Sequence, residues 1–411
     1  MNRLISAIIL GELLLPSAVA GKSPKEILKP KVILQKTGEA VNMVGDAVTL
    51  VTEKISEPIR DPKAAVSTWF DYNPLIESGE KKNINILPLF VTSPERGQGV
   101  GIEFAQESVL KKQDLLRFHI VHTLKNRSSF ELFAEPPPKT FANCGVELHL
   151  AYENYTRFYY GMGNASQEED KSTFDPQYFD IRVPVLYRWT NEWSLGLSFN
   201  YQNWKITDIQ MPSLLNNQTP SLFGTIGTRL YSTSILARWD TRNHRQDPSR
   251  GSYLEGKYEY SKKVWGSEAD YNRAAAEFRH FFQLFSMQNH VFAIHLQMDY
   301  KSGDVPFYLL PELGGIYFNR GLIEGRFRDS LLLAGNWEYR FKIYQRLHWA
   351  FFVDAGNVYP QYRSFQISHI KITGGTGMRY YVPPGNLLLA RIDAGISSEG
   401  TLIYLTFDHP F

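Results

Sequence analysis

The chain has 411 residues, with 44 basic against 42 acidic side chains, 43% apolar and 14% aromatic residues. This length exceeds one ordinary domain, and the small net charge argues against nucleic acid as a partner. The single cysteine, Cys144, excludes an intramolecular disulfide framework and a zinc or iron–sulfur site built from several thiolates. The 26 Phe, 8 Trp and 23 Tyr under a negative mean hydropathy indicate that apolar and polar residues alternate.

The N-terminus has the order of a secretory signal peptide. Arg3 precedes an apolar run from Leu4 to Leu15, and the small residues Ala18-Val19-Ala20 follow. We therefore expect residues 1–20 to be a signal peptide that is cleaved after Ala20. No cysteine follows the run to accept a lipid anchor, and no later stretch of 18 apolar residues predicts a membrane-spanning helix.

Residues 21–82 predict a periplasmic segment made of one amphipathic helix and a linker. Apolar residues from Leu34 to Ile55 recur at spacings of three and four, which forms a single stripe on a helix. Two interpretations stay open: the helix lies on another surface, or it plugs a pore or docks under one. Asp61-Pro62 and Asn73-Pro74 then mark a linker that ends near Lys82.

From Asn83 to the end, the pattern has a period of two, which predicts β-strands. Between Arg326 and Phe341 the even positions are mostly polar and the odd positions mostly apolar. The same alternation sets Phe351 on the face opposite Phe352 and Asp354. Strands of about 10 to 16 residues are long for a globular sheet, where five or six is usual, and suit tilted strands that cross a membrane.

Turn signals separate these runs at a regular pitch and give about 16 strands, an even number that leaves both chain ends in the periplasm. The expected short connectors are Lys125–Ser128, Thr190–Glu192, Asp247–Gly251, Gln288–His290 and Pro383–Asn386. The expected long connectors are Glu135–Asn143, Asn164–Pro176, Met211–Thr219 and Lys301–Asn319. Residues 83–411 therefore predict an all-β fold, a transmembrane antiparallel β-barrel in the outer membrane, with the short turns on the side of the chain termini.

The segment Thr401–Phe411 is a candidate terminal strand. Ile403, Leu405 and Phe407 fall on one face, and the chain ends on Phe411. An aromatic C-terminus resembles the last strand of bacterial outer-membrane barrels, which the assembly machinery reads. So many aromatic residues on long strands suit interfacial girdles, so outer-membrane lipid is an expected partner. A soluble secreted β-protein is a weaker alternative, because it would have to hide this apolar face.

No motif of an enzyme or a cofactor site is present. The sequence lacks a nucleophile elbow, an H-E-x-x-H motif, a phosphate loop and a glycine-rich dinucleotide turn. His119 and His122 are three residues apart in a predicted strand, so they lie on opposite faces and are poor metal co-ligands. We expect no catalytic residues, no metal, no cofactor and no nucleic-acid partner.

The last third of the chain carries a constellation of motifs. An Arg-Gly pair, Arg320-Gly321, is followed by an F-x-D-x-G motif formed by Phe352, Asp354 and Gly356. On these residues the sequence resembles the bacterial surface antigen family of outer-membrane barrels, which includes BamA, TamA and the two-partner secretion transporters. In that family the Arg-Gly pair lies at the tip of the sixth extracellular loop, folds back into the lumen and meets the F-x-D-x-G motif.

The resemblance covers the chain from about Asp240 to Phe411 and includes a D-x-R…P-x-x-G turn and an E-Y-R-F strand. The family's loop motif is [VI]-R-G-[FY], whereas here Asn319 and Leu322 flank the pair. The resemblance implies a lumen latch in which Arg320 binds Asp354, and a guanidinium in a narrow lumen can bind a carboxylate bidentately. Two interpretations stay open: the pair holds the loop as a rigid plug, or it acts as a functional latch.

Alternation also predicts a ladder of charged side chains in the lumen, made of Arg326, Arg328, Glu338, Arg340 and Arg379. Family members that insert or export polypeptides carry periplasmic POTRA domains of roughly 75 to 80 residues ahead of the barrel. Residues 21–82 read instead as one helix and a linker, so we expect neither POTRA domains nor client capture at their strand edges.

The resemblance implies a role in outer-membrane protein or lipid assembly or in translocation, with client or accessory envelope proteins as partners. Its mechanism would be local bilayer thinning and a weak seam between the first strand, near Ile84 to Thr92, and the last. The alternative is a passive channel or structural barrel closed by its sixth loop.

Overall fold

The computed structural model describes residues 84–93, 97–107, 115–135, 143–210, 214–217, 222–245, 247–283, 289–381 and 389–407. The predicted signal peptide, the predicted helix of residues 34–55 and Phe411 lie outside these ranges. Within them, no helix is both long and apolar enough to cross a membrane.

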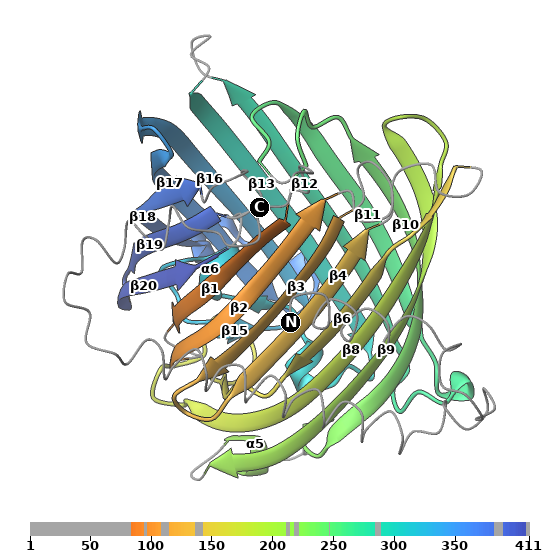
Figure 1. Cartoon of the computed structure of the whole chain (residues 1–411). Coiled ribbons are helices and arrows are strands. Elements are labelled where there is room, and N and C mark those ends of the chain that lie inside the picture. Colours follow the sequence, from red (N-terminus) through yellow and green to blue (C-terminus); the bar gives the residue numbers. More distant parts are fainter. Residues whose placement is uncertain are drawn as a thin grey trace, which may run out of the picture. The chain divides into compact units, whose positions relative to one another are not determined.

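All but two of the described strands form one antiparallel sheet that closes on itself into a barrel (Figure 1). The strands of the wall are β1 (Ile84–Ser93), β2 (Gly97–Glu107), β3 (Leu115–Thr123), β4 (Ser128–Glu135), β5 (Cys144–Val146), β6 (Leu148–Glu153), β7 (Arg157–Tyr159), β8 (Ser172–Arg188), β9 (Trp193–Gln210), β10 (Gly227–Asp240), β11 (Gly251–Ser261), β12 (Tyr271–Gln283), β13 (His290–Gly303), β16 (Leu331–Tyr344), β17 (Leu347–Tyr359), β18 (Lys371–Tyr381), β19 (Leu389–Ser397) and β20 (Gly400–Thr406).

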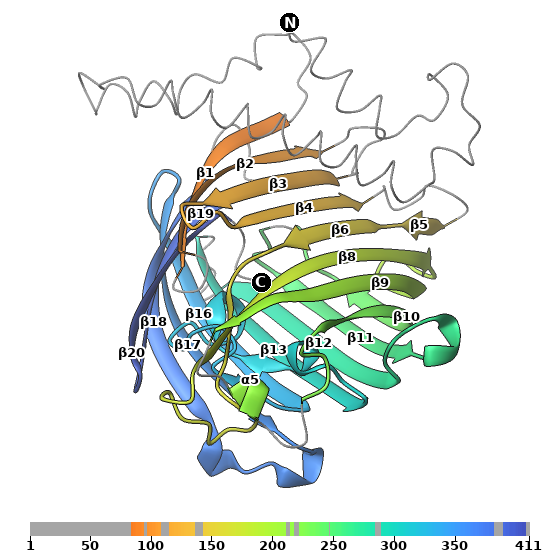
Figure 2. The same cartoon turned by 90° about the horizontal axis from the view of Figure 1, so that it is seen from below.

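Strands β5, β6 and β7 follow one another along β8 and act as one interrupted strand of the wall. The wall therefore has sixteen strands, each antiparallel to its neighbours, which confirms the predicted fold class. Figure 2 shows the first of them, from β1 to β6, side by side in chain order. The short elements between wall strands are α5 (Leu214–Asn217), η1 (Lys263–Trp265), η3 (Phe307–Leu309), β14 (Glu312–Leu313), α6 (Gly315–Phe318), β15 (Phe327–Arg328), η4 (Tyr362–Ser364) and η5 (Ile367–His369).

The two-residue period sorts side chains between the lumen and the outside of the barrel. On β17, Phe351 points outward and is 52% exposed, whereas Phe352 points into the lumen and is 3% exposed. On β16, Glu338 and Arg340 are buried, whereas the alternate residues Trp337 and Tyr339 are partly exposed on the outer face. The predicted register of these strands is therefore confirmed.

The strand predicted from Arg326 to Phe341 begins only at Leu331. Its first residues instead form β15, which pairs with β14 in a separate two-stranded sheet inside the loop between β13 and β16. Arg326 and Arg328 consequently belong to that loop and not to the wall. The alternation runs through this boundary because β15 is itself a short strand, so periodicity alone does not reveal the break.

Two connectors lie at the end of the barrel opposite to the one predicted. Connectors between antiparallel neighbours alternate between the two ends, so residues 124–127 lie at the same end as the long connectors. Strand β4 ends, and β5 begins, at the end where β1 begins. The predicted loop Asn164–Pro176 also ends early, since β8 begins at Ser172. The ladder shifts register between Asp175 and Pro176, where a proline without an N–H is tolerated.

Candidate functional site: the sixth loop in the barrel lumen

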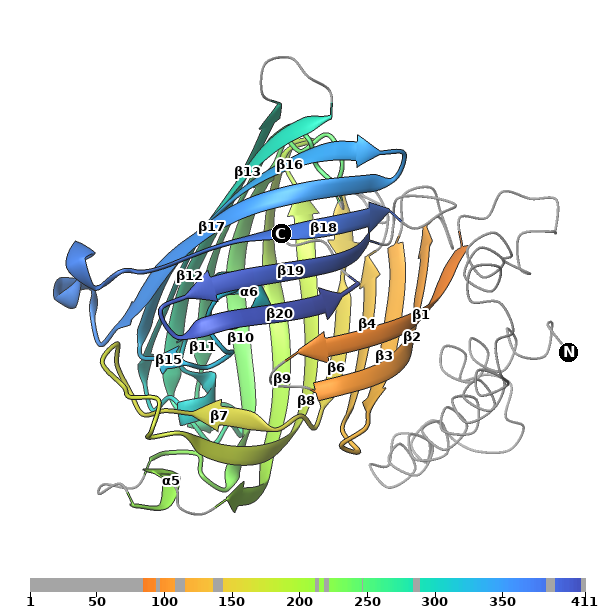
Figure 3. The same ribbon diagram turned by 90° about the vertical axis from the view of Figure 1, so that its left-hand side faces the viewer.

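The connector of residues 304–330, called loop 6 here, is the sixth at the barrel end opposite to the start of β1. It contains η3, β14, α6 and β15. Helix α6 lies against β16 and β17, and Figure 3 shows it on the inner side of the wall formed by β17 to β20. Loop 6 therefore occupies the lumen.

Arg320 at the tip of loop 6 binds Asp354 of β17 with three hydrogen bonds. Its Nε donates to Oδ2 at 2.9 Å, its Nη2 to Oδ1 at 2.8 Å, and its backbone N–H to Oδ2 at 3.0 Å. The ring of Phe352 lies under the guanidinium, with 3.5 Å from Cζ to the ring centre. Arg320 is 1% and Asp354 0% exposed, so the pair is a buried, bidentate ion pair with a cation–π contact.

A second carboxylate extends the ion pair to the neighbouring strands. Arg320 Nη1 donates to Oε2 of Glu338 at 2.7 Å, and Arg379 Nη2 donates to the same oxygen at 3.0 Å. Arg379 Nη1 also donates to Oδ1 of Asp393 at 2.6 Å. These five residues, called the Arg320 cluster, join loop 6 to β16, β17, β18 and β19, and every member is at most 1% exposed.

The carboxylates of the cluster keep the Arg320 guanidinium charged although it is buried. Burial by itself lowers the pKa of Arg320, but Asp354, with Glu338 and Asp393, raises it above the ordinary value of an arginine. The guanidinium therefore stays charged in the lumen. Removing one partner of such a buried pair leaves an uncompensated charge and costs about 3–5 kcal/mol.

Glycines make room for the loop tip against the wall. A Cβ on Gly321 would lie 2.7 Å from Cγ2 of Thr373 on β18, and a Cβ on Gly395 of β19 would lie 2.8 Å from the backbone nitrogen of Gly321. A Cβ on Gly356, the last residue of the F-x-D-x-G motif, would lie 2.7 Å from Cδ1 of Leu313 in loop 6. These distances are closer than real Cβ contacts, so each position requires glycine for the packing seen.

The flanking residues that depart from the family's loop pattern are both buried. The Asn319 amide donates to the carbonyl oxygen of Lys371 at 3.4 Å. Leu322 packs in an apolar cluster with Leu313, Phe327, Leu332, Ala334 and Val358. Its carbonyl oxygen also accepts a hydrogen bond from the hydroxyl of Tyr404 on β20 at 3.3 Å. A leucine thus provides the apolar anchor of the tip, and the tip reaches the last strand.

The predicted charge ladder is divided between the wall and the loop. Glu338 and Arg379 belong to the Arg320 cluster, and Arg340 lies beside it, with 3.6 Å from its Nε to Oε1 of Glu338. Arg328 donates instead to Glu312 and to the carbonyl oxygen of Phe307, both within loop 6. Arg326 Nε donates to Oε2 of Glu399, in the turn between β19 and β20, at 2.9 Å.

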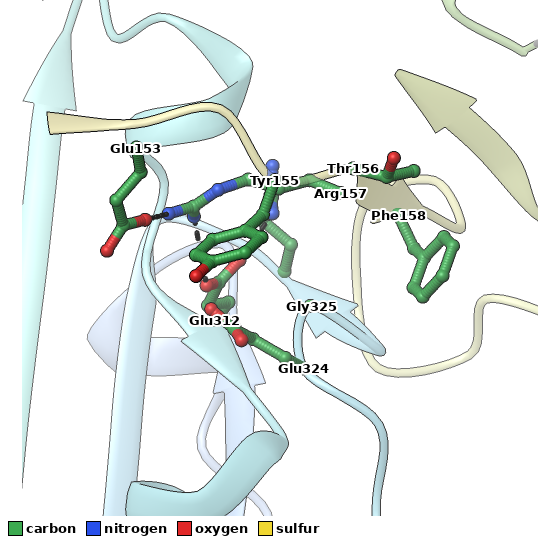
Figure 4. Close-up of a pocket in the computed structure, with 9 residues that line it drawn as sticks. Glu153, Tyr155, Thr156, Arg157, Phe158, Glu312, Glu324 and Gly325 are labelled. Carbon is green, nitrogen blue, oxygen red and sulfur yellow. Dashed lines mark hydrogen bonds and ion pairs between the residues drawn. The ribbon is translucent and has the colours of Figure 1, made fainter. Parts of the chain in front are cut away.

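A second polar contact joins loop 6 to the end of β6 and the start of β7. Figure 4 shows Arg157 between the carboxylates of Glu153 and Glu312. Arg157 Nη2 donates to Glu153 at 3.1 Å, and its Nη1 lies 3.9 Å from Oε1 of Glu312. Glu312 is also the partner of Arg328. Loop 6 is therefore tied to the early strands of the barrel as well as to the late ones.

An aromatic core packs the start of loop 6 against β7, β8 and β9. Tyr308 of η3 stacks on Trp204 at 4.5 Å between ring centres, and Trp204 stacks on Tyr178 at 4.1 Å. Phe307 meets Tyr159 and Phe174 edge to face. This core and the Arg320 cluster hold loop 6 on opposite sides of the lumen, so the loop is packed as a plug.

The seam where the barrel closes is weakly paired. Among the described residues, β1 and β20 pair at one position, Thr92 opposite Leu405. By contrast, β1 and β2 pair at ten positions and β19 and β20 at seven. Strand β20 ends at Thr406, so Phe407 of the predicted terminal signal lies just beyond the ladder.

Several residues of the site received no role in the sequence interpretation. Asp393, Gly395 and Tyr404 complete the site, and their inward parity on β19 and β20 was the available signal. The structure also brings His119, His149 and Glu131 into one lumenal row, with 3.5 Å and 2.7 Å from the imidazoles to the carboxylate. Within the described ranges, no group of three or more such side chains could hold a metal ion.

Comparisons with known proteins agree with this architecture. The Omp85 superfamily domain matches residues 98–396. A structure of BamA from Haemophilus ducreyi lacking POTRA domains 1–3 has a TM-score of 0.57 and 13% identity, covering 80% of this chain and 70% of that chain. CdiB from Acinetobacter baumannii has a TM-score of 0.52 and 12% identity, covering 80% and 60%. CdiB from Escherichia coli has a TM-score of 0.50 and 12% identity, covering 80% and 66%.

The chain thus spans less than two thirds of the two CdiB chains, and at these identities the likeness concerns the fold alone. The comparison with curated proteins found no match. The family match covers most of the chain, including the whole of loop 6 and the F-x-D-x-G strand. This chain belongs to the Omp85 superfamily, and it is a sixteen-stranded barrel of the outer membrane.

Proposed function

We propose that this barrel acts in outer-membrane protein or lipid assembly or in translocation, and that its seam is the moving part. The observation that carries the proposal is the pairing of β1 with β20 at one described position, where β1 pairs with β2 at ten, β19 with β20 at seven and β4 with β6 at six. Backbone N–H and C=O groups without a strand partner are a template for pairing with another chain. Client or accessory envelope proteins and outer-membrane lipid are the partners that this function needs.

The short last strand and the packed lumen support a route beside the barrel. The seven residues of β20 rise about 3.4 Å each, and at a tilt of about 45° they span roughly 17 Å, less than the apolar band of about 25 Å of such barrels. A bilayer fitted to this strand is locally thin. Loop 6 meanwhile packs against the lumenal face of the wall through buried ion pairs and aromatic rings.

A locked seam tests the proposal. In a Cys144→Ser background, Thr92→Cys with Leu405→Cys joins the strands across the seam, since the two residues face each other. The matched control, Ile392→Cys with Leu405→Cys, joins β20 to its other neighbour β19 at the same residue. We expect the oxidised seam pair to cause an envelope assembly or export defect that reduction reverses, and the control pair to cause none. Normal function with the seam fully cross-linked would contradict the proposal.

The burial of loop 6 favours a second candidate, a structural barrel or a channel closed by its plug. The Arg320 cluster at 0–1% exposure is a dry contact between loop and wall, as a permanent plug requires. Conductance in planar bilayers separates the candidates. A channel should conduct and open further with Arg320→Ala, whereas the assembly function predicts little conductance together with a barrel-assembly defect on depletion.

A further inference from the structure

The end of the last strand is held by a side chain from the other side of the seam. Arg117, on β3, donates from Nη2 to the carbonyl oxygen of Phe407, just after β20, at 3.2 Å. Its Nε donates to Oε1 of Glu103 on β2 at 2.6 Å. Arg117 thus connects the third strand of the barrel to the end of the sixteenth.

This contact requires the chain to leave the line of the ladder after Thr406. Through the ladder, Arg117 lies level with Ala105 of β2 and Asn85 of β1. If β20 continued along the seam from the pair of Thr92 and Leu405, Phe407 would instead lie level with Phe90 of β1, five residues away from Asn85. Strands β3 and β20 would also be about 14 Å apart across β2 and β1, more than an arginine side chain spans. The carbonyl of Phe407 therefore turns toward the lumenal face of β3.

Glu103 orients the arginine for this task. Glu103 is 1% exposed, and a buried carboxylate is costly unless it is paired with a cation. The Arg117 side chain is 34% exposed, so one end of the guanidinium is fixed by Glu103 and the other is available to the carbonyl. Tyr404 of β20 and Glu399, in the turn before β20, are bound to loop 6. The last strand is thus held from both halves of the barrel.

We propose that Glu103 and Arg117 form a clasp that holds the carboxy-terminal end of β20 across the seam and must release before the seam opens. Arg117 makes the bond to the strand, and Glu103 is the positioning residue. The inference rests on the proposed function for the purpose of opening, but the clasp itself is tested without any measurement of activity. Loop 6 would keep its hold on Tyr404 while the clasp releases, so opening would begin at the end of β20.

Hydrogen exchange of the full chain in lipid nanodiscs tests the clasp. In Arg117→Gln we expect the amides of β20 and β1 to exchange about tenfold faster, while those of β12 keep their rate. The matched control is Arg238→Gln, because Arg238 also binds a lumenal carboxylate of the neighbouring strand, Glu255 on β11, and reaches a second one, Glu147 between β5 and β6, away from the seam. Unchanged exchange in β20, or equal acceleration in Arg238→Gln, would overturn the inference.

A charge swap separates the clasp from a local role of the ion pair. Arg117→Glu combined with Glu103→Arg keeps an ion pair between β2 and β3 but points a carboxylate at the Phe407 carbonyl. We expect the amides of β20 to exchange as fast in the swap as in Arg117→Gln. In Arg117→Lys, which retains a hydrogen-bond donor, their exchange should return toward the wild-type rate. A swap that restores wild-type exchange would show that the pair serves only β2 and β3. Faster exchange at the seam with unchanged envelope assembly would contradict the proposed function and still support the clasp.

Discussion

Replacing Arg320 by alanine should release the tip of loop 6. The substitution removes the two side-chain hydrogen bonds to Asp354 and the one to Glu338, keeps the bond from the backbone N–H, and leaves both carboxylates buried at 0% exposure. The expected cost is about 3–5 kcal/mol for the closed loop. At about 1.4 kcal/mol per factor of ten, exchange of the amides in residues 314–325 should speed up by roughly 10² to 10³ or more.

Asp354→Ala should produce a loss of similar size, and the double variant should be no worse than either single one. Once one partner is gone, removing the other also removes a buried charge without a counterion. Arg229→Ala is the control, because the Arg229 ion pair with Glu268 is half exposed and should contribute less than about 1 kcal/mol. Strictly additive effects of the two single changes would refute the coupling read from the geometry.

Three further predictions concern register and packing. In a Cys144→Ser background, Phe351→Cys should react with a lipid-phase reagent and Phe352→Cys should not, and the reverse result would mean that the register is wrong by one residue. Gly395→Ala should destabilise the packed loop 6 by about 1–3 kcal/mol, measured by hydrogen exchange. The control is Gly374→Ala, which should have no such effect because its added Cβ would lie at an ordinary 3.8 Å from the carbonyl oxygen of Phe352. Equal effects would argue against the close approach at Gly395. Phe307→Ala should cost about 3–5 kcal/mol and expose loop 6 to protease, while Tyr362→Ala, at an exposed position, leaves it resistant; an intact loop in Phe307→Ala would deny the aromatic core its role.

Strand content, strand number and the inward or outward direction of side chains could be predicted from the sequence. The pleat of a strand fixes which residues share a face, so the burial of Phe352 and the exposure of Phe351 follow from parity alone. The Arg320 and Asp354 pair came from a motif resemblance, and the structure places them within hydrogen-bond distance.

What periodicity could not supply is the arrangement across strands. Asp393 and Glu338 lie 55 residues apart in the chain and meet only because Arg379 on β18 lies between their strands. The break at Leu331 was hidden, because β15 continues the same alternation inside loop 6. No sequence pattern predicts the contact of Arg117 with Phe407, because it depends on where the barrel closes and on the chain turning away from the strand ladder after Thr406.

Site-specific photo-crosslinking in intact envelopes tests the central claim, that the barrel works at its seam, most directly. The photoreactive residue would replace Ile403, which points outward from β20 and is 57% exposed. The comparison site is Ile235, 65% exposed on β10, the eighth wall strand and so half a barrel away. We predict protein adducts from Ile403 that are lost when the seam is locked, and lipid alone at Ile235. Equal protein adducts at both sites, or none at Ile403, would contradict the account.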